Sequence, residues 1–371
     1  MVAAGSNLVD EVWGEEKPGM PHEKVFVLDD KYTGQSVKDK YKDIAKEMPE
    51  GVDLMLVTTL DDIAWMLNLR GNDIEYNPLF FSYVLFHKNG DDSRVDLFVD
   101  ADKISDPNVA EHLKNNNISV FGYDEITSKL KEYSETLENK KISVDKNQCN
   151  YRLFQHLEED KFDIQPQSHN IIELLKACKN KVQQEGMRNC NVRDCAAIMK
   201  YFAFLEEELA KENHGLNEYI GAQKVTEYRG MGELYVGPSF EPISSIGANG
   251  AVIHYSPTKD ESMPLNNDEI YLLDSGGQYY DGTTDITRTV HFGGKAPTDF
   301  QKNCYTRVLM GTLDLERVVW PKGTYHGGDF DILARRHLFE VGLDYKHGTG
   351  HGVGSLLCVH EGPIGVSRGY T

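Results

Sequence analysis

The chain has 371 residues and a formal net charge of −20 at pH 7, because 59 Asp and Glu outnumber 39 Lys and Arg. Nucleic-acid binding requires a surplus of basic side chains to contact phosphates, so this charge argues against it. Most of the charge is expected to form an acidic surface that keeps the protein soluble. The length is sufficient for two domains of ordinary size.

Cysteines and apolar runs indicate the compartment. The six cysteines form no C-x-x-C pair, which predicts reduced thiols rather than a disulfide framework or a zinc site. The first residues lack the basic and apolar regions of a signal peptide. No apolar run approaches the roughly 20 residues that a membrane span needs. We therefore expect a cytoplasmic protein that binds no membrane.

The first half of the sequence predicts one compact α/β domain. Residues 1–30 are polar and rich in proline and glycine, which is typical of a tail or linker. From residue 31 to residue 168, segments with the apolar period of helices alternate with apolar runs of strand length. The expected helices are 34–49, 61–71, 106–116 and 124–137, and the expected strands are 52–59, 80–90, 94–100, 118–123 and 141–147.

The pattern changes after residue 168, and we assign residues 169–371 to a second domain. A long helical stretch over 171–211 is expected to bend or split near Gly186, because glycine weakens a helix interior. From Tyr219 onward, short strands and glycine turns are expected to dominate. Two further helices are expected at 304–320 and 327–342.

Two carboxylates stand out in the second domain. Asp274 ends an apolar run of strand length, and Asp285 follows 11 residues later. An odd spacing puts two residues of one straight strand on opposite faces, so these carboxylates converge only if a turn intervenes. Residue preference places the turn at Asp281–Gly282, whereas direct pairing of the two aspartates places it at Tyr279–Tyr280. A bulge would also change the register.

Three histidines lie in a glycine-rich stretch near the end of the chain. His347 and His351 are four residues apart, but four interleaved glycines argue against a helix and suggest close backbone packing. A neutral imidazole is the commonest metal ligand and carries protons near neutral pH. His347, His351 and His360 are therefore candidate site residues, with ordinary core or surface histidines as the alternative. His254, at the end of another apolar run, is equally a core or a catalytic candidate.

These residue types together suggest a metal site. A lone buried carboxylate is costly, and a metal cation is one standard way to stabilise it. The alternative for Asp274 is a cap of the turn in its DSGG sequence. Arg288 follows Asp285 closely and is expected to orient a nearby carboxylate. Glu361 follows His360 and is expected to form a salt bridge.

Four segments resemble a known family, the X-Pro aminopeptidases or aminopeptidase P, which are pita-bread metallopeptidases related to prolidase and creatinase. Three of them carry the candidate residues: IHYSP (253–257), LDSGGQYYDGTTDITRT (273–289) and HGTGHGVGSLLCVHEGP (347–363). The fourth, WMLNLRGNDIEYNPLFFSY (65–83), resembles the domain before the catalytic one in the large cytosolic eukaryotic form. The resemblance covers about 22–371. It implies a creatinase-N-like α/β domain followed by a pita-bread α+β catalytic domain.

The resemblance also implies roles for the candidate residues. The family binds two Mn²⁺ ions through two Asp, one His and two Glu, and Asp274, Asp285 and His351 resemble three of these ligands. His254, His347 and His360 resemble the histidines that bind substrate or move protons. The implied reaction removes the N-terminal residue of a peptide with proline at position two, through water activated by two metals. Such peptides are the expected partners, and a homodimer is the expected assembly.

The sequence departs from the family pattern in one respect. The two Glu ligands of the family lie in segments resembling D-E-P-G-Y and G-x-R-x-E-N, and neither segment occurs in these 371 residues. The first domain of the large form has no counterpart either. We therefore expect a chain truncated at both ends, with an incomplete pita-bread domain, weak metal binding and little hydrolysis. The alternative is a non-catalytic pita-bread protein that serves as a binding or scaffold module.

Overall fold

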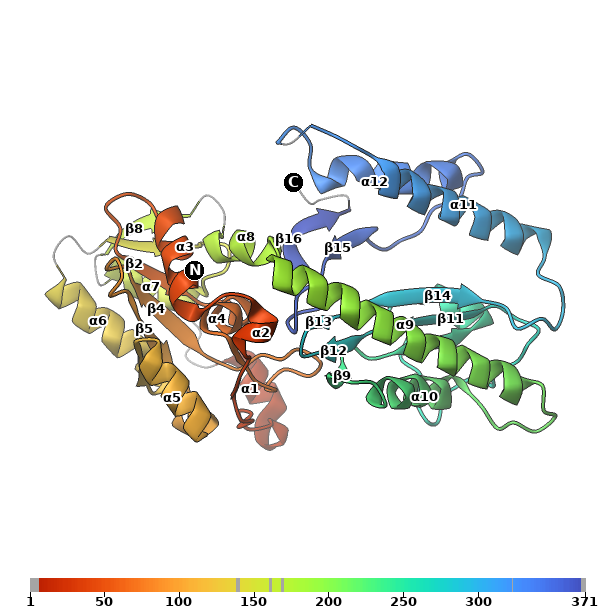
Figure 1. The fold of residues 1–371 in the computed structure, drawn as a ribbon, viewed down its shortest axis with the longest axis horizontal. Coiled ribbons are helices and arrows are strands. Elements are labelled where there is room, and N and C mark those ends of the chain that lie inside the picture. The colour runs from red at the N-terminus through yellow and green to blue at the C-terminus, as the bar shows by residue number, and fades with distance from the viewer. Residues whose placement is uncertain (1–6, 138–140, 160–161, 168–169, 322, 368–371) are drawn as a thin grey trace.

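The structure is a computed structural model that describes residues 7–137, 141–159, 162–167, 170–321 and 323–367. One six-stranded sheet with the order β6-β5-β4-β2-β7-β8 forms the centre of the N-terminal half (Figure 1). Strands β5, β4 and β2 pair antiparallel, whereas β6, β7 and β8 join in parallel. The strands are β2 Leu54–Val57, β4 Tyr83–His87, β5 Arg94–Phe98, β6 Ile118–Phe121, β7 Lys141–Val144 and β8 Asp163–Pro166.

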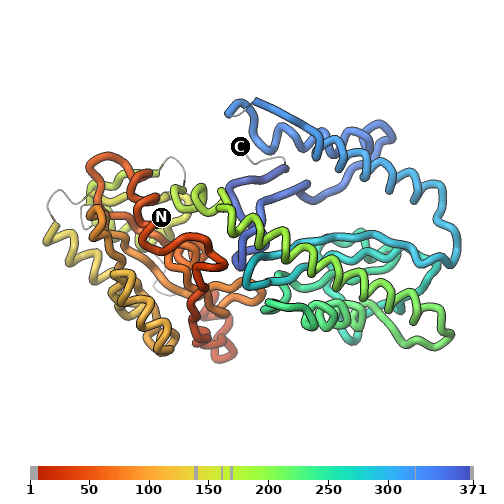
Figure 2. The backbone as a smooth tube through the Cα atoms, in the orientation of Figure 1, coloured from red at the N-terminus to blue at the C-terminus, as the bar shows by residue number. Residues whose placement is uncertain are grey.

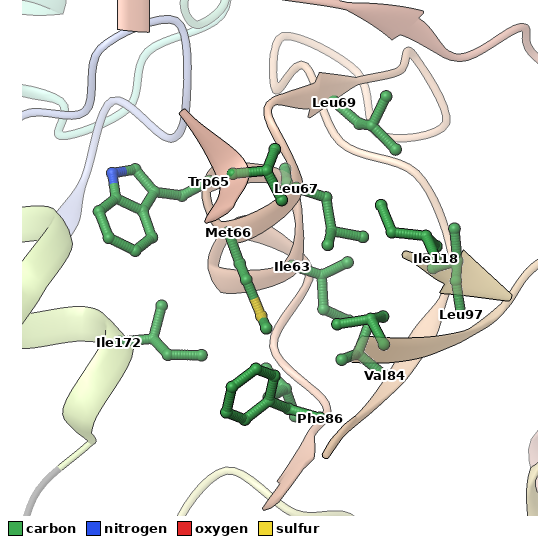
Figure 3. Close-up of a cluster of buried hydrophobic side chains, with 14 of the residues drawn as sticks. Ile63, Trp65, Met66, Leu67, Leu69, Val84, Phe86, Leu97, Ile118 and Ile172 are labelled. Carbon is green, nitrogen blue, oxygen red and sulfur yellow. The ribbon is translucent and has the colours of Figure 1, made fainter. Parts of the chain in front are cut away.

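Helices cover both faces of this sheet, because successive side chains of each strand point to opposite sides. Met55 and Val57 belong to one core with α3, α4 and α5, whereas Leu54 and Leu56 belong to the other with α6 and α7. Figure 3 shows part of the first core, with Ile63, Met66 and Phe86 among its labelled side chains. The helices are α3 Val37–Glu47, α4 Leu60–Leu67, α5 Pro107–Asn115, α6 Ile126–Thr136 and α7 Tyr151–Glu159.

Every helix and strand expected between residues 31 and 168 is present, although α7 and β8 were not among them. The expected tail is partly structured: β1 (Phe26–Val27) pairs with β3 (Leu69–Arg70), and Val25 and Leu28 are buried. The segment from Val25 therefore belongs to the core. The short helices in this half are α1 Leu8–Trp13, η1 Gly14–Glu16, α2 Asp30–Thr33, η2 Ala101–Ile104 and η3 Tyr123–Glu125.

The long helical stretch is split, but not near Gly186. It consists of α8 (Ile171–Ala177) and α9 (Lys181–Leu209), and Gly186 lies buried inside α9. The break comes at Asn180, whose side chain caps α9 while Gln183 caps back onto the Asn180 backbone. A further helix, α10 (Glu218–Gly230), occupies a segment where short strands and turns were expected.

The strands that carry the aspartates pack against α9 and α10 (Figure 1). Two small antiparallel sheets have the orders β10-β11-β14 and β9-β12-β13. Helices α11 (Asp299–Arg317) and α12 (Gly327–Phe339) confirm the two helices expected there and lead to the pair β15–β16. The strands are β9 Tyr235–Pro238, β10 Ile243–Ile246, β11 Tyr271–Ser275, β12 Gly277–Tyr279, β13 Gly282–Thr283, β14 Ile286–Val290, β15 Gly350–Gly352 and β16 Glu361–Val366, and η4 is Gly247–Ala251.

The two halves share buried surface. Ile171 and Ile172 of α8, and Leu357 from the segment between β15 and β16, are members of the same core as α4. The backbone trace in Figure 2 shows the blue C-terminal segment running back toward the N-terminal half. Within the ranges that the structure describes, no helix combines the length and the apolar character needed to cross a membrane.

Candidate metal centre

The register of one antiparallel ladder brings the two candidate aspartates onto the same face. Asp274 in β11 pairs with Thr287 in β14, so Asp285 lies diagonally across the ladder, one residue before β14 begins. Diagonal neighbours two residues out of register point to the same side of a sheet. The odd spacing in the sequence therefore gives a shared face once the chain turns back on itself.

The turn lies between the two positions that the sequence left open. β12 and β13 pair so that Tyr280 and Asp281 form the turn. The register is the same as in the β11–β14 ladder, so no bulge separates the two aspartates. Gly276, which lies across from Asp285, has no room for a side chain, because a Cβ atom there would lie 2.0 Å from the Thr284 carbonyl oxygen.

His351 lies in β15 and meets Asp285 from a different sheet. Its Nε2 lies 3.2 Å from Asp285 Oδ2, and its Nδ1 lies 2.7 Å from the Gly352 carbonyl oxygen. Since a carbonyl oxygen only accepts, Nδ1 carries a proton, and Nε2 of the neutral ring presents a lone pair to the carboxylate. Two lone pairs this close need a proton or a metal cation between them. The contact with Asp285 accordingly raises the pKa of His351.

His360 completes a set of donors around Asp285. Its ring packs edge-on against His351, with centroids 4.3 Å apart and an interplanar angle of 84°. One donor atom from each of Asp285, His351 and His360 lies within 4.8 Å of the other two. Burial and then the neighbouring His351 lower the pKa of His360, which favours a neutral ring. Carboxylate and imidazole donors at this spacing can hold a divalent cation.

Asp274 lies on the same face but is not part of this closely spaced set. It is half-buried, and its Oδ1 accepts a 2.8 Å hydrogen bond from the Thr287 hydroxyl. Burial raises the pKa of Asp274 and so does the carboxylate of Asp285, against the lowering effects of Thr287, His254 and His360. Two carboxylates on one face repel each other, and a cation between them would remove that repulsion.

His254 lies on an exposed turn after η4, with a left-handed backbone φ of 56°. Non-glycine residues rarely adopt such a φ, so surrounding contacts have to hold it. Glu218 at the start of α10 supplies them, since its buried carboxylate accepts from the Ile246 N–H and from the Tyr255 hydroxyl. The charge of His254 lowers the pKa of Asp274, which places the imidazole in the electrostatic field of the site.

His347 lies before β15 and is exposed. Its ring stacks on Tyr345 with centroids 4.7 Å apart, and its Nδ1 lies 2.8 Å from the Gly348 carbonyl oxygen. Among the residues that the structure describes, no hydrogen bond, ion pair or ring contact joins His347 to either aspartate. The structure thus brings together Asp274, Asp285, His351 and His360, with His254 beside them, and leaves His347 apart.

The sequence predicted contacts for two charged residues beside the site, Glu361 and Arg288, and the structure confirms one of the two predictions. Glu361 is buried and pairs with Lys179, which confirms the expected salt bridge. The expectation that Arg288 orients a carboxylate is wrong, because its Nη1 donates a 2.8 Å hydrogen bond to the Thr287 carbonyl oxygen and no described carboxylate pairs with it. Side chains alternate along β14, so Arg288 points away from the face that carries Thr287 and Asp285.

Three buried polar residues were not among the candidate site residues, although Arg70 and Gln278 lie in the segments 65–83 and 273–289 that carry the resemblance. Glu218, Arg70 and Gln278 are each at most 3% exposed. One signal does exist for Arg70, because a charged residue at the end of the apolar run AWMLNLR has to find a partner when that run is buried. Nothing in the spacing of Glu218 and Gln278 distinguishes them from surface residues.

Comparison with known proteins gives the family of both halves. The sequence profile of the creatinase/prolidase N-terminal domain matches residues 16–183, and that of metallopeptidase family M24 matches residues 185–371. The expected order, a creatinase-N-like α/β domain followed by a pita-bread α+β domain, is thereby confirmed.

Several relatives carry names or titles that describe an activity. Probable Xaa-Pro aminopeptidases P of Pyrenophora teres f. teres and Botryotinia fuckeliana are 45% and 44% identical over 372 residues, covering 98% and 99% of this chain. The crystal structure of X-prolyl aminopeptidase from Caenorhabditis elegans, titled a cytosolic enzyme with a di-nuclear active site, matches 100% of this chain with a TM-score of 0.90 and 34% identity. An Xaa-Pro dipeptidase from Bacillus anthracis covers 91% of this chain with a TM-score of 0.66 and 20% identity, and shares the fold.

The lengths of these proteins differ from the length of this chain. The chain spans 55% of each of the two fungal relatives and 59% of the Caenorhabditis elegans protein. The Bacillus anthracis enzyme is covered to 86%.

Proposed function

Because this chain belongs to metallopeptidase family M24, we propose that it forms the metal-binding part of an Xaa-Pro aminopeptidase, which releases the N-terminal residue of a peptide with proline at position two. One observation carries the proposal: donor atoms of Asp285, His351 and His360 converge to within 4.8 Å of one another. The relatives that are 44–45% identical bear the name of this activity.

The side chains of the site fit a divalent cation. His351 donates through Nδ1 to a carbonyl oxygen and turns Nε2 toward Asp285, which is the usual arrangement of a ligating histidine. Asp274 adds a second carboxylate on the same face. The carboxylate oxygens suit Mn²⁺, and we propose two Mn²⁺ with Asp274, Asp285 and His351 as ligands. When bound, such a pair supplies a nucleophilic water at neutral pH and polarises the scissile carbonyl.

The remaining histidines are proposed to act on the peptide. His360 lies against His351 and can donate a hydrogen bond to the oxyanion that develops during hydrolysis. His254 presents an exposed imidazole from a turn that Glu218 holds rigid, which suits substrate binding or proton transfer. His347 is proposed to contact the substrate farther from the aspartates, since its ring is fixed by Tyr345.

We also propose that the 371-residue chain by itself holds the metal pair weakly and hydrolyses peptides slowly. Carboxylate oxygens suit Mn²⁺, and two divalent cations held side by side need anionic ligands to compensate their charge. The residues that the structure describes gather two aspartates and two histidines at this face. Fewer anionic oxygens mean less compensation of four positive charges, and therefore lower affinity.

The compartment and the partners complete the proposal. We propose a cytoplasmic location, in keeping with six free cysteines and with a similar structure that is titled a cytosolic enzyme. The net charge of −20 supports peptides rather than nucleic acid as the partner. A homodimer is proposed on family resemblance.

The test combines metal titration with a pair of peptides. Mn²⁺ is titrated into the purified chain by calorimetry, and two peptides that differ only in proline or alanine at position two are offered at rising Mn²⁺ concentration. Asp285→Asn is the matched control, because it keeps the size of the side chain and removes its charge. We expect slow cleavage of the proline peptide alone, at a rate that rises with Mn²⁺ and disappears in the control.

Two other outcomes separate the parts of the proposal. Tight binding of two ions with rapid cleavage would contradict the weak activity but support the enzyme. Absence of both Mn²⁺ binding and cleavage would contradict the enzyme proposal for this chain and favour a non-catalytic pita-bread binding or scaffold protein.

A further inference from the structure

Side chains from outside the metal centre hold the loop that joins His351 to His360. Three consecutive backbone carbonyl groups of this loop, at Ser355, Leu356 and Leu357, each accept a hydrogen bond from a buried side chain. The donors are Arg70 of the N-terminal α/β domain and Gln278 of the hairpin that carries the aspartates. The loop is thus attached to two separate parts of the molecule.

Arg70 reaches the loop from β3, directly after α4. Its Nε donates to the Leu356 carbonyl oxygen at 2.5 Å and its Nη2 to that of Ser355 at 3.4 Å, while Nη1 donates to the carbonyl oxygens of Ala64 and Leu69 at 2.7 and 2.8 Å. The side chain is 1% exposed, and no carboxylate forms an ion pair with it among the described residues. Carbonyl groups therefore replace a counter-ion, helped by the negative end of α4.

The charge of Arg70 persists despite this burial. Burial lowers the pKa of Arg70 to about 9, and the carboxylate of Glu361 opposes that shift. The guanidinium is consequently protonated at neutral pH and keeps all of its donors. A buried cation that binds only backbone oxygens is costly to build, which indicates a specific task for the contact.

Gln278 reaches the same loop from β12. Its Nε2 donates to the Leu357 carbonyl oxygen at 2.8 Å and to that of Tyr76 at 3.1 Å, and its Oε1 accepts from the Thr283 hydroxyl at 2.6 Å. One amide group therefore connects the hairpin between Asp274 and Asp285, the N-terminal domain, and the loop between His351 and His360. Because the amide is 3% exposed, water cannot replace these bonds.

The loop needs such support because of its own backbone. Leu356 has a left-handed φ of 47°, a conformation that costs free energy for a leucine and persists only where neighbouring contacts impose it. The Gly354 N–H bonds to the Cys358 carbonyl oxygen at 3.0 Å and closes the loop. His360 follows two residues after Cys358, so the position of its ring depends on this turn.

We propose that Arg70 and Gln278 are positioning residues that fix the loop between His351 and His360, and with it the placement of both imidazole rings at Asp285, so that the N-terminal domain is a structural part of the metal centre. Neither side chain touches the donors themselves. They act through the backbone of residues 355–357. The metal-binding consequence rests on the proposed function, whereas the placement of the loop does not.

The test uses two substitutions in different domains and a matched control. Arg70→Met and Gln278→Met remove the donors at similar side-chain volume. Lys40→Met is the control, because Lys40 is also a buried cation that donates to a carbonyl oxygen of α4, that of Trp65 at 2.7 Å, but has no bond to the loop. Amide hydrogen exchange is measured by mass spectrometry on peptides covering 353–360, and Mn²⁺ affinity is measured by calorimetry under conditions in which every variant is folded.

We expect exchange in 353–360 to be at least tenfold faster in Arg70→Met and Gln278→Met and unchanged in Lys40→Met. The Mn²⁺ dissociation constant should rise at least tenfold in the first two variants alone, with a smaller rise in Arg70→Lys, which keeps the charge but fewer donors. If amide exchange in 353–360 is as slow in Arg70→Met and Gln278→Met as in Lys40→Met, the proposal is overturned. If Arg70→Met does not fold, Gln278→Met decides by the same criterion.

The two measurements, amide exchange and Mn²⁺ affinity, also test this proposal and the proposed function independently of each other. Faster exchange without Mn²⁺ binding by the unmodified chain would support the positioning role and contradict the metal site. Unchanged exchange in the Arg70 and Gln278 variants, together with Mn²⁺ binding by the unmodified chain, would contradict the positioning role and support the metal site.

Discussion

Gly186 of α9 lies directly against Asp281 at the turn of the aspartate hairpin: a Cβ atom at Gly186 would lie 2.2 Å from the Asp281 carbonyl oxygen. Cys190, one helical turn further on, is fully buried, and a Cβ atom at Gly282 would lie 2.6 Å from its sulfur atom. The long helix thus sets the position of the turn, and through it the register that brings Asp274 and Asp285 onto one face.

Gly186→Ala should therefore destabilise the protein, although alanine favours helices. The gain in helix propensity is about 1 kcal/mol at most, whereas forcing a methyl group into this contact costs about 1–3 kcal/mol or more. Urea denaturation followed by circular dichroism measures the difference. Gly230→Ala in α10 is the control, since its Cβ would meet nothing nearer than Tyr235 at 4.0 Å. Equal stability of the two variants would show that the hairpin moves away without cost.

The first half of the chain was predictable because its helices and strands carry their own periodicity. Buried strand residues such as Met55 and Val57 alternate with Leu54 and Leu56, and both sets are apolar because helices cover both faces. The break before α9 had a readable signal in the capping pair Asn180 and Gln183.

Two predictions for the second half are wrong, the helix break at Gly186 and the turns in place of α10. Both concern glycines inside helices that allow a neighbouring group to approach closely. Gly221 lies inside α10, where a Cβ atom would approach the Ser244 hydroxyl oxygen to 2.6 Å. Together with Gly230 it made the helix resemble a turn-rich segment in sequence. The same holds for Gly186, because the sequence does not distinguish a glycine that makes room for a neighbouring backbone from a glycine that ends a helix.

The candidate site was predictable in its residue types but not in its geometry. The sequence identifies two carboxylates and four histidines, yet the shared face depends on a turn at Tyr280 and Asp281 that neither residue preference nor direct pairing selects. The support from Arg70 depends on a contact between residues far apart in the sequence, which no local pattern encodes.

His351→Ala should weaken Mn²⁺ binding, while His347→Ala should not. Both imidazoles direct Nδ1 to the carbonyl oxygen of the following glycine, so the variants lose the same local bond. His351 has the carboxylate of Asp285 at its Nε2, at 3.2 Å, whereas no carboxylate of the described residues lies at that of His347. Loss of one ligand should raise the dissociation constant roughly tenfold or more, as measured by calorimetry. Equal affinities of the two variants would remove His351 from the ligand set.

Glu218→Gln should loosen the segment that presents His254. The carboxylate accepts from the N–H groups of Ile246 and Met263 and from the hydroxyl of Tyr255, and an amide cannot accept from all of them. We expect a loss of about 2–3 kcal/mol of stability, with faster amide exchange over residues 247–263.

The matched control for Glu218 lies in the same helix. Glu227 is exposed and, within the described part of the chain, pairs with Lys224 alone, so Glu227→Gln should change stability by less than about 0.5 kcal/mol. Exchange over 247–263 that stays unchanged in Glu218→Gln would show that His254 is held by other contacts.

Asp96→Asn tests a buried charge in the N-terminal sheet, far from the metal centre. Its carboxylate is fully buried and accepts from His87, Arg94 and Tyr133 at 2.8, 2.7 and 2.5 Å. Burial raises the pKa of Asp96, but the bonds from His87 and Tyr133 outweigh it, and the net pKa is lowered. At neutral pH the substitution should cost about 2–4 kcal/mol, because an amide cannot satisfy these donors.

The sign of the pH dependence follows from the lowered pKa of Asp96. The folded chain holds this proton less tightly than the unfolded chain, whose Asp pKa is about 3.9. The ionised carboxylate therefore stabilises the fold fully above about pH 5, and this contribution is lost as the pH falls through the lower folded pKa. Urea denaturation between pH 7 and pH 3 should show the two proteins converging. Asp92→Asn, at an exposed position in the adjacent turn, should show no such pH-dependent difference, and a constant gap for Asp96→Asn would mean that its bonds do not depend on charge.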